Sequence, residues 1–234
     1  MRAKAIFLDF YGTLVHEDDD ILPPIYDQIR ASMEASSEPG EIGQYWWKTL
    51  SGLFDASFGD RFKPQRELGL LSLAETLAHF GSDCSAEQLI RGQFDHWMKP
   101  ELYEDTLPFL STFRHLPTYI LSNIDTADIA AATMFHGIKV TDIITSEDVR
   151  AYKPRPELFL EGMKRCGLKP SEIVHIGDSY SSDVIGAGKL GIQTIWLNRL
   201  HKRQPQGPEP DYVCHDLKAA ERWLLQSKED VARY

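Results

Sequence analysis

Four short polar segments of this sequence carry side chains that could do chemistry together. They are Asp9-Phe10-Tyr11-Gly12-Thr13, Ser122-Asn123, Lys153-Pro154 and Gly177-Asp178-Ser179, the last followed by Asp183. Carboxylates are ligands that a hard cation such as Mg²⁺ prefers, whereas hydroxyl, amide and ammonium groups bind anionic oxygens. Taken singly, each segment has an ordinary structural explanation, such as an Asp in a turn, a helix N-cap or a surface lysine.

Three of these segments follow a short apolar run that is typical of a buried strand. We expect strands at 5–8, 119–121, 142–145, 172–176, 194–197 and, at the sheet edge, 211–214. Helical patterns fill the intervals at 106–116, 125–136, 156–166, 181–190 and 216–227. Strands that alternate with helices predict a Rossmann-like, doubly wound parallel α/β sheet. Ligands bind beyond the carboxyl ends of the strands in such sheets, which is where Asp9, Ser122 and Asp178 stand.

The residues between the first two strands show helical periodicity and no convincing strand. We expect helices at 22–36, 41–58, 65–80 and 85–98, joined by short loops as in a four-helix bundle. The prediction is therefore an α/β catalytic core formed by 1–16 and 100–234, with an inserted helical cap at 17–99. The linkers, 14–21 and Lys99-Pro100-Glu101, should lie close together and act as a hinge. The acidic run 17–20 is expected to be a solvated loop.

The order, spacing and strand-end placement of the four segments resemble the haloacid dehalogenase-like (HAD) hydrolase superfamily. The resemblance covers nearly the whole chain and includes the segment Asp183-Val184-Ile185-Gly186-Ala187-Gly188. The position of the insert resembles the helical cap of the group that holds phosphoglycolate-phosphatase-like enzymes and haloacid dehalogenases. The resemblance implies that Asp9 is a nucleophile that forms a covalent aspartyl intermediate, which water then resolves.

The resemblance also implies which residues bind the substrate and the metal. The anionic group of the substrate would be bound by Thr13, Ser122, Asn123 and Lys153. A Mg²⁺ ion would be held by Asp9, the backbone carbonyl of Tyr11, Asp178 and Asp183, the last directly or as a support that orients water. Lys153 would also neutralise charge that develops during the reaction.

Tyr11 departs from the pattern of the superfamily's phosphatases. Most of them have an Asp two residues after the nucleophile as general acid and base, and a phenol with a pKa near 10 is a poor base at neutral pH. Metal-independent 2-haloacid dehalogenases carry Tyr there, because halide leaves without a proton. The Gly177-Asp178-Ser179 segment instead resembles the metal-binding phosphatase form, and Phe159 stands where dehalogenases usually place Tyr. We therefore favour a Mg²⁺-dependent phosphatase and keep the dehalogenase as the alternative.

Two further functions stay open. A Mg²⁺-dependent phosphonate hydrolase group also lacks the second Asp and uses a cap lysine as a Schiff base, for which Lys48 and Lys63 are candidates. A non-enzymatic binding protein on the same scaffold is the other possibility. Without the general acid, a phosphatase should prefer esters whose leaving group needs little protonation, such as aryl or acyl phosphates.

The composition excludes some classes of binding partner. Of 234 residues, 25 are Lys or Arg and 35 are Asp or Glu, which gives a formal net charge of −10. Nucleic acids and anionic membranes bind basic patches, so neither is expected as a partner. Three well-separated cysteines, the absence of a signal-peptide pattern and the absence of an apolar run of membrane-spanning length favour a cytoplasmic protein with a small anionic substrate. Nothing in the sequence indicates an oligomeric state.

Overall fold

Six parallel strands form one sheet in the computed structural model, which describes residues 3–33, 37–38 and 40–229. The strands are β1 (Ala5–Leu8), β2 (Thr118–Ser122), β3 (Asp142–Thr145), β4 (Ile173–Gly177), β5 (Gln193–Leu197) and β6 (Tyr212–Cys214). Their order is β3-β2-β1-β4-β5-β6, and each neighbouring pair is parallel. The predicted strands are confirmed to within one residue at each end, and β6 lies at the sheet edge.

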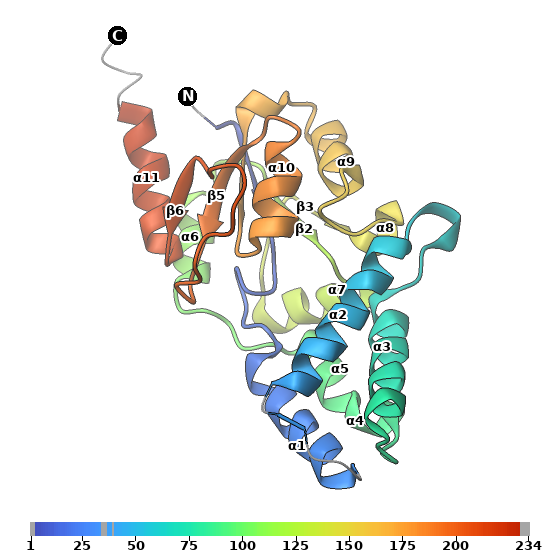
Figure 1. Cartoon of the computed structure of the whole chain (residues 1–234). Helices are drawn as coiled ribbons and strands as arrows, with labels where there is room; N and C mark the ends of the chain where they lie inside the picture. The colour runs from blue at the N-terminus through green and yellow to red at the C-terminus, as the bar shows by residue number, and fades with distance from the viewer. Residues whose placement is uncertain (1–2, 34–36, 39, 230–234) are drawn as a thin grey trace.

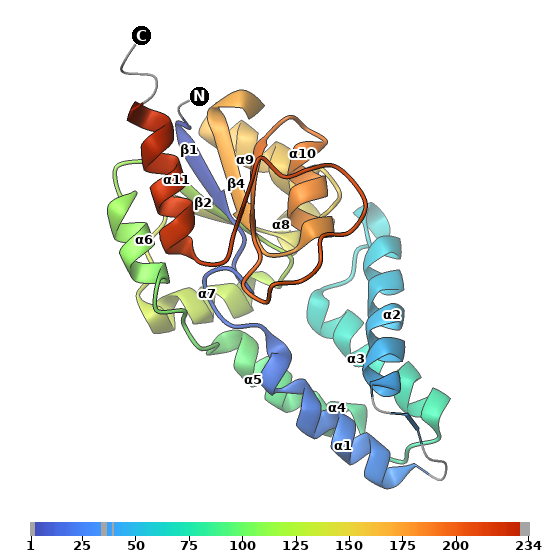
Figure 2. The same cartoon turned by 60° about the vertical axis from the view of Figure 1, so that its left-hand side comes forward.

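Helices cover both faces of this sheet, as expected for a doubly wound fold (Figure 2). Ile6 and Leu8 of β1 pack in one apolar cluster with residues of α6 (Thr106–Thr112), α7 (Thr126–His136) and α11 (Leu217–Glu229). The alternate residues Ala5 and Phe7 pack with α9 (Glu157–Cys166) and α10 (Gly186–Gly188) on the other face. A strand buried on both faces is apolar at most positions, which explains the unbroken run Ala5–Leu8.

The helices predicted for the sheet domain differ from the structure in three places. The helix expected at 106–116 ends at Thr112. The helix expected at 181–190 is a π-helical turn, Tyr180–Ile185, followed by the short α10. The short helix α8 (Ser146–Val149) was not predicted, because its four residues are too few for a periodic pattern. Thr145 and Asp148 form a capping box that starts this helix at the end of β3.

The segment between β1 and α6 is mainly helical (Figure 1). It contains α1 (Leu22–Ser32), α2 (Glu41–Ala56), α3 (Gln65–Phe80), α4 (Ala86–Leu89) and α5 (Arg91–Met98). The predicted helix at 22–36 ends at Ser32, and residues 34–36 lie outside the described residues. The predicted helix at 85–98 is divided at Ile90 into α4 and α5, and Ser85 caps α4. The cap limits 17–99 stay a prediction.

The helical segment has its own apolar cluster and several sets of contacts with the sheet domain. The cluster includes Ile29, Ile42, Trp46, Leu73 and Leu77. The two linkers are hydrogen-bonded side by side, since the amide of residue 16 donates to the carbonyl of residue 101 at 2.8 Å and the amide of 103 to the carbonyl of 14 at 3.2 Å. In the described residues no helix is both long and apolar enough to span a membrane.

The second set of contacts joins α3 to the loop that follows β2. The Asp125 carboxylate accepts hydrogen bonds from the backbone amides of Gln65 at 2.6 Å and Arg66 at 3.0 Å. The Arg66 guanidinium binds both oxygens of Asp128 on α7, at 2.8 and 2.5 Å. The start of α3 is therefore fixed to the polypeptide that carries Ser122.

Candidate active site

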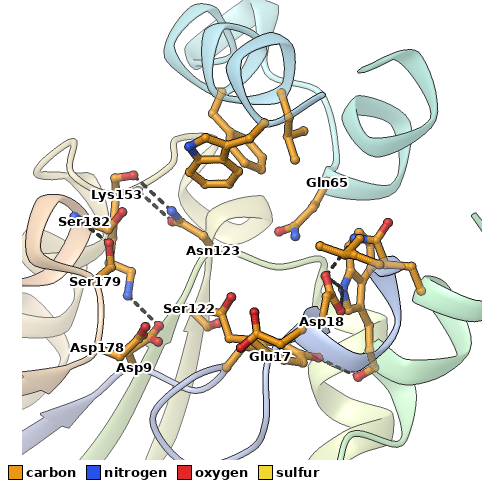
Figure 3. A pocket seen from close by; sticks show the side chains of 18 of the residues that line it. Asp9, Glu17, Asp18, Gln65, Ser122, Asn123, Lys153, Asp178, Ser179 and Ser182 are labelled. Carbon is orange, nitrogen blue, oxygen red and sulfur yellow. Dashed lines mark hydrogen bonds and ion pairs between the residues drawn. The ribbon is translucent and has the colours of Figure 1, made fainter. Parts of the chain in front are cut away.

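A cavity of about 450 Å³ lies at the carboxyl end of the sheet, under the helices of the insert (Figure 3). Asp9 enters it from the end of β1, Ser122 from the end of β2 and Asp178 from the turn after β4. Lys153 comes from the loop between α8 and α9. Residues from four parts of the sequence thus meet at one edge of the sheet, as the topology of a parallel α/β fold requires.

Lys153 is the central cation of this site. Its side chain is 2% exposed, and its Nζ donates to Asp9 Oδ1 at 2.7 Å and to Asp183 Oδ1 at 2.6 Å. Burial by itself lowers the pKa of an ammonium, but the two carboxylates outweigh burial and raise the pKa of Lys153 above its ordinary value. Lys153 is therefore a permanent positive charge beside the predicted nucleophile.

The carboxylates of Asp9 and Asp183 differ in how they are stabilised. Burial raises the pKa of Asp9 to about 6, although Lys153 acts in the opposite direction. Burial also favours the neutral form of Asp183, but Lys153 and His175 outweigh it and hold the pKa of Asp183 well below its usual range. His175 Nε2 donates to Asp183 Oδ1 at 2.9 Å, and the amide of Ser179 donates to Oδ2 at 3.0 Å. Asp183 is thus a fixed anion that orients Lys153.

Asp178 lies where it could share a metal ion with Asp9 and Asp183. Asp9, Asp178 and Asp183 each have a carboxylate oxygen within 4.8 Å of a carboxylate oxygen of the other two. Burial, followed by Glu17, Asp9 and Asp183, raises the pKa of Asp178 well above its ordinary value. Gly12 packs directly on this carboxylate with a φ of +77°, and a Cβ at Gly12 would lie 2.6 Å from Asp178 Cγ. Three carboxylate oxygens this close together fit the ligand preference of Mg²⁺.

The predicted anion-binding residues divide into those that line the cavity and one that does not. Ser122 lines it and is 2% exposed. Asn123 also lines it, but its side chain is bound to the Lys153 backbone: Oδ1 accepts from the amide of Lys153 at 2.7 Å, and Nδ2 donates to its carbonyl at 3.0 Å. Thr13 is fully buried and does not line the cavity, and its hydroxyl has no hydrogen-bond partner among the described residues. Its role in anion binding stays a prediction.

The Tyr11 side chain points toward the insert. Its hydroxyl donates to the carbonyl of Trp97, at 2.6 Å, near the end of α5. Burial, with Asp128, Asp18 and Asp9 nearby, raises the pKa of Tyr11 well above its ordinary value. The phenol is therefore a weak acid whose proton is committed to another bond, and it does not replace a general acid.

Several residues at the cavity were not identified from the sequence. They are Glu17, Asp18, Asp19, Gln65, Gln93, Trp97, Ser182 and Lys202. The acidic run was expected to be a solvated loop, and Glu17 and Asp19 are indeed exposed, but they line the cavity together with the partly buried Asp18. Only the closeness of this run to the first motif could have indicated it. The glutamines lie on predicted helices and have no sequence signal.

The cap lysines lie away from the cavity. Lys48 on α2 is exposed, and Lys63 forms an ion pair with Glu67. Neither lines the cavity. The Schiff-base chemistry of a phosphonate hydrolase therefore has no support from these two side chains.

A family model for haloacid dehalogenase-like hydrolases matches residues 3–191, and this match covers most of the chain. The chain belongs to the haloacid dehalogenase-like hydrolases. The expectation drawn from the four motifs is thereby confirmed, and the protein is a hydrolase of this superfamily.

Relatives within the superfamily divide between two chemistries. A glyceraldehyde 3-phosphate phosphatase from Methanopyrus kandleri is 36% identical over 93 residues, which cover 39% of this chain and 40% of the relative. An (S)-2-haloacid dehalogenase 4A from Burkholderia cepacia is 26% identical over 235 residues, covering 96% of this chain and 95% of the relative. The matched segments span 24% to 40% of the length of the first three curated relatives.

The fold is shared with solved members of the superfamily. The crystal structure of the HAD-hydrolase YfnB from Bacillus subtilis, bound to magnesium, superimposes with a TM-score of 0.73 at 19% identity. The superposition covers 96% of this chain and 99% of that one. At this identity the likeness shows the fold, so the reaction must be argued from the site itself.

Proposed function

We propose that this protein is a Mg²⁺-dependent phosphatase that hydrolyses small phosphorylated substrates through an aspartyl-phosphate intermediate on Asp9. The observation that carries the proposal is Asp178, whose carboxylate lies beside those of Asp9 and Asp183, while Lys153 pairs with Asp9 and Asp183 alone. A metal-independent dehalogenase has no use for this third acid, because it adds uncompensated negative charge beside a nucleophile. A divalent cation bound by all three carboxylates would compensate their negative charge.

The residues of the chain suit both steps of the proposed reaction, formation of the aspartyl phosphate and its hydrolysis. The Asp9 carboxylate attacks phosphorus, the ester P–O bond breaks, and the leaving oxygen departs with its electron pair. Water then attacks the phosphorus of the acyl phosphate, which releases inorganic phosphate and restores the Asp9 carboxylate. Lys153 lies close enough to Asp9 to hold the anionic group in place, and Asp183 keeps Lys153 oriented. A bound Mg²⁺ would neutralise charge on the transferring group.

The proton for the leaving oxygen has no evident source in Tyr11, whose hydroxyl is bonded to the Trp97 carbonyl. The best substrates should therefore be those whose leaving group is stable as an anion, such as aryl or acyl phosphates. A series of aryl phosphates assayed with Mg²⁺ should show rates that rise steeply as the leaving-group pKa falls. A flat profile would contradict this reasoning.

The first test is a panel of phosphate esters assayed with and without Mg²⁺, with Asp9→Asn as the control for the nucleophile. We expect turnover of an activated aryl phosphate that needs both Mg²⁺ and Asp9. If the wild type and Asp9→Asn are equally inert on every ester with Mg²⁺ present, a non-enzymatic binding role gains support. Turnover that persists in Asp9→Asn would show that another group is the nucleophile.

A second candidate function is a metal-independent 2-haloacid dehalogenase. Tyr11 favours it, and so does the B. cepacia dehalogenase, which aligns over nearly the whole chain. Here Asp9 would displace halide from carbon, and no proton is needed for the leaving group. Incubation with a 2-haloacid in EDTA separates the two functions, because halide release that survives chelation would refute the phosphatase.

A further inference from the structure

Helix α2 forms the side of the cavity that faces the catalytic residues. In Figure 3 this helix, drawn in pale blue, lies across the cavity from Asp9 and Asp178. The residues of α2 that line the cavity include Trp47, Leu50 and Phe54. Their spacing of three and then four positions places them along one line of the helix. An apolar stripe of α2 therefore lies opposite the predicted nucleophile.

A different face of α2 already serves the packing of the insert. Ile42 and Trp46 are buried in the apolar cluster of the helices, and Trp46 Nε1 donates to Ser72 Oγ on α3 at 2.9 Å. This face lies about a quarter of a turn away from the stripe. A surface helix needs one apolar face to pack on its domain, so the packing does not explain Trp47, which is 64% exposed. Exposed apolar surface that lines a cavity is suited to cover a ligand.

The stripe begins beside Lys153 and is fixed there. The Phe54 ring packs against the Tyr152 ring, with the ring centroids 4.5 Å apart, and Tyr152 directly precedes Lys153 in the sequence. The Tyr152 hydroxyl donates to the carbonyl of Lys63, in the loop after α2, at 2.7 Å. These contacts hold the end of α2 against the loop that carries Lys153. The fold therefore sets the separation between the anion-binding lysine and the apolar stripe.

The size and chemistry of the cavity indicate which part of a substrate the stripe would cover. Cavities of about 450 Å³ enclose a whole small ligand, and a phosphate beside Lys153 would fill only part of this one. Glu17 and Asp18 line another side of the cavity (Figure 3). The leaving group adjoins the phosphate and would lie against α2. Because the Tyr11 proton is committed to another bond, this group should be stable as an anion, and an aryl oxide is both stable and apolar.

We propose that Trp47, Leu50 and Phe54 bind the leaving group of the substrate, and that this group is an aromatic ring with apolar substituents. The inference rests on the proposed phosphatase function and narrows its substrates to apolar aryl phosphates. The ring would lie against the stripe, with the phosphate beside Lys153. Contact between the ring and the stripe would remove apolar surface from water on both partners. Specificity is thereby assigned to α2, and bond cleavage to the sheet domain.

The test is a series of 4-alkylphenyl phosphates, from the methyl to the butyl compound, assayed with Mg²⁺ at pH 7.5. The alkyl chain leaves the pKa of the phenol nearly unchanged, so the series varies the apolar surface alone. We expect kcat/KM to rise about two- to fourfold for each added methylene, as burial of that group predicts. The 4-(2-hydroxyethyl)phenyl ester matches the propyl ester in size, and its kcat/KM should be roughly tenfold lower because a hydroxyl is costly to bury.

Variants of α2 assign this dependence to the stripe. Trp47→Ala and Leu50→Ala should each weaken the dependence on chain length, and the two together should reduce it to less than about twofold across the series. Trp47→Ala removes a mainly exposed side chain and should keep the wild-type Tm, so it tests the proposal even if the double variant unfolds. Leu71→Ala is the matched control, because it removes an exposed leucine on α3 outside the cavity and should keep the wild-type dependence.

Three outcomes overturn the proposal in different ways. A kcat/KM that is constant or falls with chain length in the wild type would show that the cavity does not bind an apolar leaving group. A dependence that is unchanged in Trp47→Ala and in the double variant would place the recognition elsewhere. Acetyl phosphate, which is activated and has no ring, separates the inference from the proposed function. If the wild type hydrolyses neither acetyl phosphate nor any aryl ester, the phosphatase function fails and this inference with it, whereas hydrolysis of acetyl phosphate without preference among the aryl esters removes only the inference.

Discussion

Asp178→Asn should change the stability of this protein in opposite directions with and without Mg²⁺. In a metal-free buffer, Lys153 pairs with Asp9 and Asp183, whereas the pKa of the third acid, Asp178, is raised because burial and neighbouring acids oppose its ionisation. Replacing it with Asn removes the charge and keeps the shape. We therefore expect the variant to be more stable than the wild type in EDTA, and less stable than the wild type in excess Mg²⁺.

The magnitude follows from the separation of the carboxylates. The oxygens of Asp178 and its neighbouring acids lie within 4.8 Å. One unit of uncompensated charge at that distance costs about 3 kcal/mol at an effective dielectric constant of 20. Partial protonation of Asp178 reduces this, so the gain in EDTA should be about 1–3 kcal/mol, or roughly 2–4 °C in Tm for each kcal/mol in a chain of this size. Mg²⁺ at 100 times its Kd should stabilise the wild type by about 2.7 kcal/mol.

Thermal unfolding in EDTA and in a Mg²⁺ titration measures both effects on one instrument. Asp20→Asn is the control, since it removes an exposed carboxylate outside the cluster and should match the wild type in both buffers. Two results would refute the reasoning. Equal stabilisation of wild type and Asp178→Asn by Mg²⁺ would place the ion elsewhere, and a variant less stable than wild type in EDTA would show that Asp178 is not electrostatically strained.

Three further changes test the electrostatics of the site and the docking of the insert. Lys153→Met leaves two buried carboxylates without their cation and should lower the free energy of unfolding by about 3–5 kcal/mol in urea titrations; a loss below about 1 kcal/mol would contradict this. Burial lowers the pKa of His175, so its contribution to stability is complete above about pH 6.5 and is lost below it, by up to about 1.4 kcal/mol per pH unit. His175→Gln should flatten the dependence of stability on pH between 7 and 5.5, and parallel slopes would disprove the assignment. A double-mutant cycle with Arg66→Met and Asp128→Asn should give a coupling energy of about 1–2 kcal/mol, since Arg66 is partly exposed; additive effects would show that the bridge does not hold α3.

The sheet could be predicted from the sequence because its strands are buried on both faces. An unbroken apolar run such as Ala5–Leu8 cannot lie at a surface, and a polar residue directly after it marks the end of the strand. The helices were predicted less well where they are short. Ile90 is both the C-cap of α4 and the N-cap of α5, and its backbone stays in the α region. Hydrophobic periodicity therefore continues across the break, and the sequence predicts one helix where the structure has two. The π-helical turn at Tyr180–Ile185 likewise keeps a helical pattern.

The site could be predicted only where residues follow strands. Asp9, Ser122 and Asp178 were found because parallel topology brings strand ends together. Glu17 and Gln65 could not be found in this way, because their place at the cavity depends on how the helices of the insert pack over the sheet. His175 was hidden for another reason, since it occupies an interior strand position where a polar residue has no periodic signal, and only the contact with Asp183 explains it.

The net charge of −10 is compatible with an anionic substrate because the charges are distributed unevenly over the cavity. On one side Lys153 is held by Asp9 and Asp183, and a divalent cation beside Asp178 would make that side attractive to phosphate. On the other side Asp18 remains without a cation of its own within salt-bridge distance except His96, at 3.8 Å. The excess of acids in the whole sequence therefore does not set the charge beside Asp9, where Lys153 and a bound divalent cation would decide it.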